Sequence, residues 1–247
     1  MKVLKYFLLF LLLALAGITY AYANVARLVL VEHSSLSAIE NNMYVSEALS
    51  PNDRLAISNI LVSARERIAI HYGEPTAKPL VVVLSSQEEK QNFGLYDAPG
   101  KFLFVPWGSY LLLSHQEANI DVAAHELVHA EIFNRVGYLK RQLKIPTWFD
   151  EGVAMQVDYR PKYDSSKNIS LSEFERIISL TAPEKFWTND KSKNIENYRG
   201  AKAAVFELFK HTERELYPLL AEIEVGNSSV FSFAITKTNK ALHGTSR

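Results

Sequence analysis

The stretch AHELVHAEIF, residues 124–133, holds two histidines four positions apart, with a glutamate directly after the first. Residues four apart lie on one face of an α-helix, about one turn from each other. His125 and His129 can therefore direct their rings at a common point if this stretch is helical. Glu126, one step further round the helix, can reach a molecule held at that point. The pattern therefore predicts a helix with one polar face turned towards a binding site.

Composition limits the chemistry of such a site. The 247 residues include no cysteine, so a metal ion here would be bound by histidine, aspartate or glutamate. That ligand set suits zinc in a catalytic site, at one ion per chain. The 27 basic residues are balanced by 27 acidic ones, which gives no support for a nucleic-acid partner.

The first 23 residues have the composition of a targeting segment. Lys2 and Lys5 precede an apolar run that ends in Ala21-Tyr22-Ala23, the order found in a cleaved secretory signal peptide. The alternative is an uncleaved membrane anchor, because residues 6–23 contain no charge and are just long enough to span a bilayer. Either interpretation predicts an extracytoplasmic protein, which is periplasmic, secreted or anchored in a membrane.

The first half of the mature chain mixes helical and extended patterns. Ser50, Pro51 and Asp53 form the capping signature of a helix that Gly73 ends. Apolar and β-branched runs predict three strands after this helix, at residues 79–86, 100–108 and 110–114. A short helix is expected over residues 86–94, between the first two strands.

The motif helix is expected to begin at Asn119 or Asp121 and to end before Gly137. Residues 140–146, KRQLKIP, read as a basic loop. A new helix then starts near Thr147, which would place Glu151 in its first turn. Helical patterns continue towards the C-terminus.

This order predicts an α+β fold, in which a small mixed sheet and the motif helix precede a helical C-terminal half. We expect one domain over residues 24–247. Its α/β part would cover residues 24–140 and its helical part residues 141–247.

A catalytic zinc site usually has three protein ligands, so the third must be found outside the motif. The metzincin class takes a third histidine soon after the second, and AEIFNRVGYLK, residues 130–140, contains none. A glutamate lies 22 residues after His129, in the stretch PTWFDEGVA at residues 146–154.

This pair of motifs resembles the gluzincin metallopeptidases, and most closely their peptidase-MA-like families, in which AHELxHx is followed by PxWFxEGxA. The aminopeptidase-N-like branch typically reads W-L-N-E-G-F-A where residues 148–154 read WFDEGVA. The resemblance implies a zincin-like fold in which His125, His129 and Glu151 bind one zinc ion. It also implies that Glu126 is the general base.

The same resemblance suggests a hydrogen-bond donor for the oxyanion. Aminopeptidase-N-like enzymes use the tyrosine of a Y-x-K-G-A stretch, and this chain has NYRGAKAAVF with one residue fewer. Tyr198 is the first candidate and Arg199 the second, while Tyr198 could equally pack at the start of a helix. Residues 100–108 are the best candidate for an edge strand that binds peptide, although a core strand fits the same pattern.

Two departures from the gluzincin pattern matter. Some gluzincins orient a ligand histidine with an aspartate four residues after the glutamate, where this chain has Met155. Asp121 and Asp158 are the alternatives for that task. The G-x-M-E-N segment that holds a free amino terminus in aminopeptidases is absent, which favours an endopeptidase.

The sequence therefore predicts a zinc-dependent peptidase that acts on a peptide or protein substrate outside the cytoplasm. A zinc-binding envelope module with weak or no turnover, acting in binding or assembly, is the alternative. An aminopeptidase is a third and less supported possibility.

Overall fold

The computed structural model describes residues 5–7, 23–39, 42–164, 169–227 and 229–245. Most of the apolar run at residues 6–23 lies outside these ranges, and with it the predicted signal peptide or anchor. Within the ranges, no helix is both long enough and apolar enough to cross a membrane.

The sheet has five strands: β1 (Ser37–Ile39), β2 (Met43–Val45), β3 (Leu80–Leu84), β4 (Gly100–Val105) and β5 (Gly108–Ser114). Their spatial order is β1-β2-β3-β5-β4. The central strands β2, β3 and β5 are parallel, whereas β1 and β4 pair antiparallel with their neighbours. The predicted α+β class with a small mixed sheet is therefore confirmed, and β4 forms one edge.

Both faces of the central strands are covered, which explains why their sequences are continuously apolar. Because side chains alternate along a strand, successive residues of β3 enter different clusters. Val82 and Leu84 pack with α2 (Ala23–Val29) and α4 (Gln87–Phe93), while Val81 and Val83 face the larger core with α3 (Pro51–Tyr72) and α5 (Ile120–Lys144). The helix α5 is thereby held flat against the sheet.

Local signals set the starts of α3 and α5 as predicted. The Ser50 side chain accepts a hydrogen bond from the Asp53 backbone and Asp53 returns one, forming a complete capping box on α3. Asn119 caps α5 by accepting from the Val122 amide at 3.0 Å. α3 ends at Gly73, whose positive φ of 93° favours glycine.

The predicted end of the motif helix at Gly137 is confirmed, whereas the predicted loop at residues 140–146 was wrong. Gly137 has a non-helical φ of 76° and ψ of 171°, and a second helical segment follows it to Lys144, so α5 consists of two helices joined at a kink. Contacts far away in sequence hold the second part. The Tyr138 ring lies 5.7 Å from that of Phe104, and the Arg141 side chain is buried against Asp150. α5 thus runs across residues 140–141, where the two parts of the domain were expected to meet.

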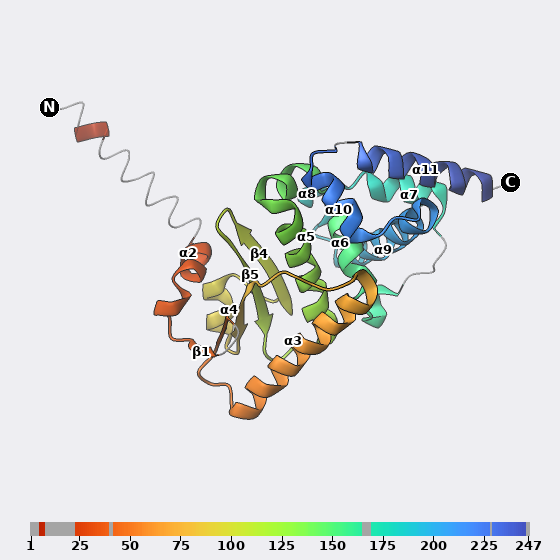
Figure 1. Ribbon diagram of the computed structural model, residues 1–247. Coiled ribbons are helices and arrows are strands. Elements are labelled where there is room, and N and C mark those ends of the chain that lie inside the picture. The colour runs from red at the N-terminus through yellow and green to blue at the C-terminus, as the bar shows by residue number, and fades with distance from the viewer. Residues whose placement is uncertain (1–4, 8–22, 40–41, 165–168, 228, 246–247) are drawn as a thin grey trace.

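The remainder of the described chain is helical: α6 (Thr147–Gln156), α7 (Leu171–Ile178), α8 (Pro183–Phe186), α9 (Lys191–Thr212), α10 (Leu216–Glu224) and α11 (Val230–Thr245), with one-turn 3-10 helices at Val31–His33 and Pro161–Tyr163. The helices α6 to α11 lie on the side of α5 away from the sheet (Figure 1). Thr147 is not the N-cap of α6, because that position is Pro146 without a side-chain cap. Glu151 therefore lies in the second turn.

Gly152 lets α6 approach α9 closely. A Cβ atom at this position would lie 2.5 Å from the Ala201 carbonyl oxygen and 2.6 Å from Val205 Cγ2. The glycine that follows Glu151 is thus required by the packing that brings α9, and Tyr198 on it, beside the two histidines.

Candidate metal centre

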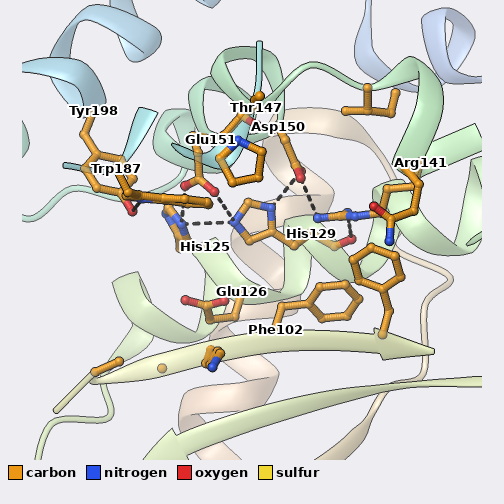
Figure 2. Close-up of a pocket in the computed structure, with 18 of the residues that line it drawn as sticks. Phe102, His125, Glu126, His129, Arg141, Thr147, Asp150, Glu151, Trp187 and Tyr198 are labelled. Atoms are coloured by element: carbon orange, nitrogen blue, oxygen red, sulfur yellow. Dashed lines mark hydrogen bonds and ion pairs between the residues drawn. The ribbon is translucent and has the colours of Figure 1, made fainter. Parts of the chain in front are cut away.

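Three predicted ligands converge at the junction of α5 and α6. His125 Nε2 and His129 Nε2 lie 3.2 Å apart, as their spacing of one helical turn predicts. The Glu151 carboxylate approaches both, with Oε2 at 3.4 Å from His125 Nε2 and Oε1 at 3.5 Å from His129 Nε2. All three side chains are buried, and their ligand atoms lie within 4.8 Å of one another. Figure 2 shows the group between the two helices.

The donor set fits a divalent cation. Glu151 Oε2 is buried and forms no hydrogen bond in the described structure, although it belongs to an ionisable group. A buried polar atom without a partner is costly, and a carboxylate more so, unless a cation or hydrogen bond compensates for the lost water. Two imidazole nitrogens and a carboxylate oxygen are a ligand set that catalytic zinc takes, with a fourth position left open.

The outer nitrogen of each histidine faces an aspartate. His129 Nδ1 lies 2.8 Å from Asp150 Oδ1, a hydrogen-bond distance. His125 Nδ1 lies 3.5 Å from Asp158 Oδ2, which is an ion-pair distance too long for a good hydrogen bond. Carboxylates in these positions orient ligand histidines and fix which ring nitrogen faces the metal.

Of the two aspartates proposed from the sequence, the structure places Asp158 beside His125 and Asp121 elsewhere. Asp121 accepts from Arg67 Nη1 at 2.5 Å and from the Tyr159 amide at 3.1 Å. Asp158 lies seven residues beyond Glu151, just after the end of α6, so the segment that follows this helix reaches the outer side of the His125 ring.

Asp150 and Asp158, the aspartates beside the two histidines, each accept hydrogen bonds from an arginine. Arg141 donates to Asp150 Oδ2 at 2.5 Å and to the His129 carbonyl oxygen at 2.6 Å. Arg160 donates to both oxygens of Asp158, at 2.9 Å from Nε and 2.5 Å from Nη2. Behind each histidine there is therefore a histidine–aspartate–arginine series of side chains that leads outwards from the candidate metal position.

These contacts determine the protonation of the ionisable side chains around the site. Burial disfavours ionisation of Asp158, but the nearby His125 ring and the hydrogen bonds from Arg160 outweigh it and lower the pKa of this carboxyl below its usual range. Burial likewise opposes protonation of His125, yet Asp158 and Glu151 together raise its pKa to about 10. Without a metal ion the His125 ring thus carries the positive charge that the carboxylates require.

Glu126 lies on the sheet side of the two histidines. It lines the cavity beside them, between α5 and β4 in Figure 2. Gly100 makes this arrangement possible, because a Cβ atom there would lie 2.6 Å from Val122 Cγ1 and 3.1 Å from Glu126 Cγ. The glycine that begins β4 therefore brings the edge strand up to the candidate base.

Tyr198 completes the opposite wall. Its ring lies 6.3 Å from that of His125, and its hydroxyl accepts a hydrogen bond from Trp187 Nε1 at 2.9 Å. Burial and the negative charge of Glu151 raise the pKa of Tyr198 well above its usual value, so the hydroxyl stays protonated. Arg199, the other candidate, is exposed and donates to the Lys162 carbonyl oxygen, away from the cavity.

The cavity above the ligands has a volume of about 740 Å³, within the size range of small-molecule and peptide sites. One wall is β4, through Gly100, Lys101, Phe102 and Phe104. The edge position expected for this strand is thus observed, and the edge faces the candidate metal position. His115 is not part of the lining, since it lies 3.5 Å from Asp53 Oδ1 instead.

Sequence reasoning missed Asp150, Arg141 and Trp187. Asp150 adjoins Glu151, but neighbouring helix residues point about 100° apart, so adjacency alone does not show that Asp150 reaches the second nitrogen of His129. Arg141 was assigned to a loop and Trp187 to no element. Only the packing of α5, α6 and α9 brings these side chains to the site.

Comparisons with known proteins do not extend the resemblance seen in the motifs. No family of proteins matches the chain, and no curated protein or solved structure shows significant similarity to it. The evidence for the function of this chain therefore comes from the residues of this site.

Proposed function

We propose that this chain is a zinc-dependent metallopeptidase of the gluzincin type, with a zincin-like fold, that hydrolyses peptide bonds outside the cytoplasm. The observation that supports this most directly is the convergence of His125, His129 and Glu151 on one buried point, with an unpartnered oxygen of Glu151 facing it. A helix that carried this motif for structural reasons alone would not leave that oxygen unpaired.

His125 and His129 would hold zinc through Nε2, and Glu151 through its carboxylate. Bound there, zinc would supply a Lewis acid that activates a water molecule and polarises the carbonyl group of the substrate. Asp158 and Asp150 keep both Nε2 atoms turned inwards, because each accepts from or faces the corresponding Nδ1.

Glu126 has the position of the general base. Its carboxylate would take a proton from the attacking water and pass it to the leaving amine nitrogen. Tyr198 would donate a hydrogen bond to the carbonyl oxygen as negative charge develops on it. Its raised pKa keeps that donor available throughout the pH range in which peptidases work.

The open edge of β4 would bind the substrate backbone. β4 pairs with β5 on one side, and its other side lines the cavity next to Glu126. A peptide added to this edge would extend the sheet by one strand and bring a peptide bond between Glu126 and Tyr198.

The decisive experiment replaces Glu126 with Gln and measures zinc and proteolysis separately. We expect about one zinc per chain, as in the unaltered protein, with hydrolysis of a peptide library reduced by about 10²–10⁴-fold. Glu117→Gln is the matched control, because this partly exposed glutamate precedes the same helix and does not line the cavity. Unchanged proteolysis in Glu126→Gln would refute the assignment.

Metal content has its own test. Glu151→Gln should lower zinc binding strongly, since the third ligand loses its charge. If the unaltered chain binds zinc but cleaves no peptide of the library, the zinc-binding envelope module becomes the better description. If acetylation of substrate amino termini abolishes cleavage, the enzyme is an aminopeptidase.

A further inference from the structure

One end of the molecule exposes several large apolar side chains close to the cavity. Trp107, at the turn between β4 and β5, is 71% exposed, and Leu139 and Leu143 are 68% and 75% exposed. Tyr96, which lines the cavity, is 51% exposed. We call these four residues the apolar rim.

The elements that carry the rim adjoin one another. The part of α5 after Gly137 touches the β4–β5 hairpin through Tyr138 and Phe104, whose rings are 5.7 Å apart. Leu139 and Leu143 are one turn apart on this segment and share a face of it. In Figure 1 the hairpin turn, α2 and the final turns of α5 lie along the same upper side of the sheet.

Helix α2, which follows the apolar run in the sequence, is fixed beside this rim. Asn24 Nδ2 donates to the Tyr96 hydroxyl at 2.9 Å, and Arg27 Nη1 donates to the Asn92 carbonyl oxygen at 3.0 Å. Leu28 is buried in the smaller core, so α2 is firmly part of the fold. The described chain therefore enters the domain beside Tyr96, one residue after the end of the uncharged stretch 6–23 of the sequence.

The charges near the rim suit a lipid surface but are few. Lys144 is exposed and forms no ion pair among the described residues, whereas Lys140 pairs with Glu224 at 3.8 Å and Arg141 with Asp150. Attraction to anionic headgroups would thus be small. Tryptophan and tyrosine favour the boundary between headgroups and acyl chains, and exposed leucines on a helix insert there.

From these observations we propose that the apolar rim rests on a bilayer surface, with residues 6–23 retained as the anchor that holds it there. The proposal does not depend on zinc or on peptidase activity. Other exposed apolar residues lie elsewhere: Leu55, which is 61% exposed, is in the first turns of α3. The start of α3 is at the bottom of the view in Figure 1, away from α2 and the β4–β5 turn.

The test uses the full chain reconstituted into vesicles, with bromine atoms on the lipid acyl chains to quench tryptophan fluorescence at the bilayer surface. The chain has three tryptophans, of which Trp148 is buried at 1% exposure and Trp187 lies in the cavity. The Trp107→Phe variant gives the fluorescence quenching of Trp148 and Trp187 alone. Subtracting it from the quenching of the unaltered chain gives the contribution of Trp107.

The matched control moves the reporter to the other side, as the double variant W107F/L55W. We expect bromolipid quenching of the Trp107 signal to be at least about twofold greater than that of the control reporter. Leu139→Ser combined with Leu143→Ser should reduce the quenching of Trp107 while circular dichroism stays unchanged. Equal quenching at both positions would overturn the proposal, and so would cleavage of the exported chain after Ala23, detected by mass spectrometry, because residues 6–23 would then not be retained.

Discussion

His129 Nδ1 lies 2.8 Å from Asp150 Oδ1, while His129 Nε2 lies 3.5 Å from the carboxylate of Glu151, the next residue along the chain. Two consecutive acidic residues of α6, Asp150 and Glu151, therefore lie next to the two different nitrogens of the His129 ring. The helix supplies the candidate third ligand and, one position earlier, the carboxylate that turns the second ligand towards it.

Asp150→Asn should weaken zinc binding by about 10–100-fold, because the amide holds the His129 ring less firmly and makes Nε2 a poorer donor. Competition against a chelator of known affinity measures this directly. Asp97→Asn is the control, since Asp97 also lines the cavity but is exposed and bonded only to Gln87 among the described residues. Equal affinities for the two variants would contradict the orienting function of Asp150.

Gly137→Ala should destabilise the fold by about 1–3 kcal/mol, because a φ of 76° with an extended ψ is strained for a residue with a side chain. Urea unfolding followed by circular dichroism gives the difference. The substitution should also loosen Arg141 from Asp150, so zinc affinity is expected to fall in parallel. Gly244→Ala, on α11 with nothing within 4 Å of the new Cβ, should leave both quantities unchanged.

Gly152→Ala should cost about 1–3 kcal/mol of stability, because the methyl group would force α6 away from the backbone of α9 at Ala201. Glu151 and Tyr198 stand on these two helices, so turnover should fall by more than the loss of folded protein explains. Activity per folded molecule, measured well below the unfolding transition, separates the two effects. An unaltered activity per folded molecule would mean that α6 and α9 repack without displacing Glu151 or Tyr198.

Asp158→Asn should lower the free energy of unfolding of the metal-free chain at pH 7 by about 3 kcal/mol, since it removes one partner of a buried ion pair. The pKa of Asp158 is lower in the folded chain than its ordinary value of 3.8. Its contribution is therefore present above about pH 4 and disappears as the pH falls through the folded pKa. Unfolding curves of both proteins should converge as the pH is lowered below about 4, and a constant difference would contradict the assignment.

Tyr198→Phe should reduce kcat by about 10²–10³-fold with little change in KM, because the hydroxyl donates only to charge that develops during the reaction. Tyr163→Phe is the matched control, since its ring packs 5.2 Å from that of Tyr198 without lining the cavity. A large change in KM with an unaltered kcat would assign Tyr198 to substrate binding instead.

Much of the site could be predicted because its signals are local. The distance between His125 and His129 follows from helical periodicity alone. Capping at Ser50 and Asn119 follows from side chains that bond to backbone groups two or three residues away. The alternation of buried residues along β3 likewise needs only the strand period and two covered faces.

Contacts between distant segments could not be read in this way. The first helix of α5 ends at Gly137 as the glycine predicts, but the second helical segment after it depends on contacts of Tyr138 with β4 and of Arg141 with α6. Asp158, and not Asp121, lies beside His125 because of where α6 ends and because Asp121 accepts a hydrogen bond from Arg67 instead.

By itself the sequence determined the residues that can bind a metal ion and the helices that carry them, because both follow from spacing along one segment. Only the tertiary structure decided that Glu151 turns its carboxylate inwards, that Asp150 and Asp158 stand behind the histidines, and that β4 leaves its edge open to the cavity. Those outcomes depend on how closely β4 packs against α5 and how closely α6 packs against α9. Residues far apart in the chain set both distances, above all Gly100 and Gly152, which have no side chain to hold the elements apart.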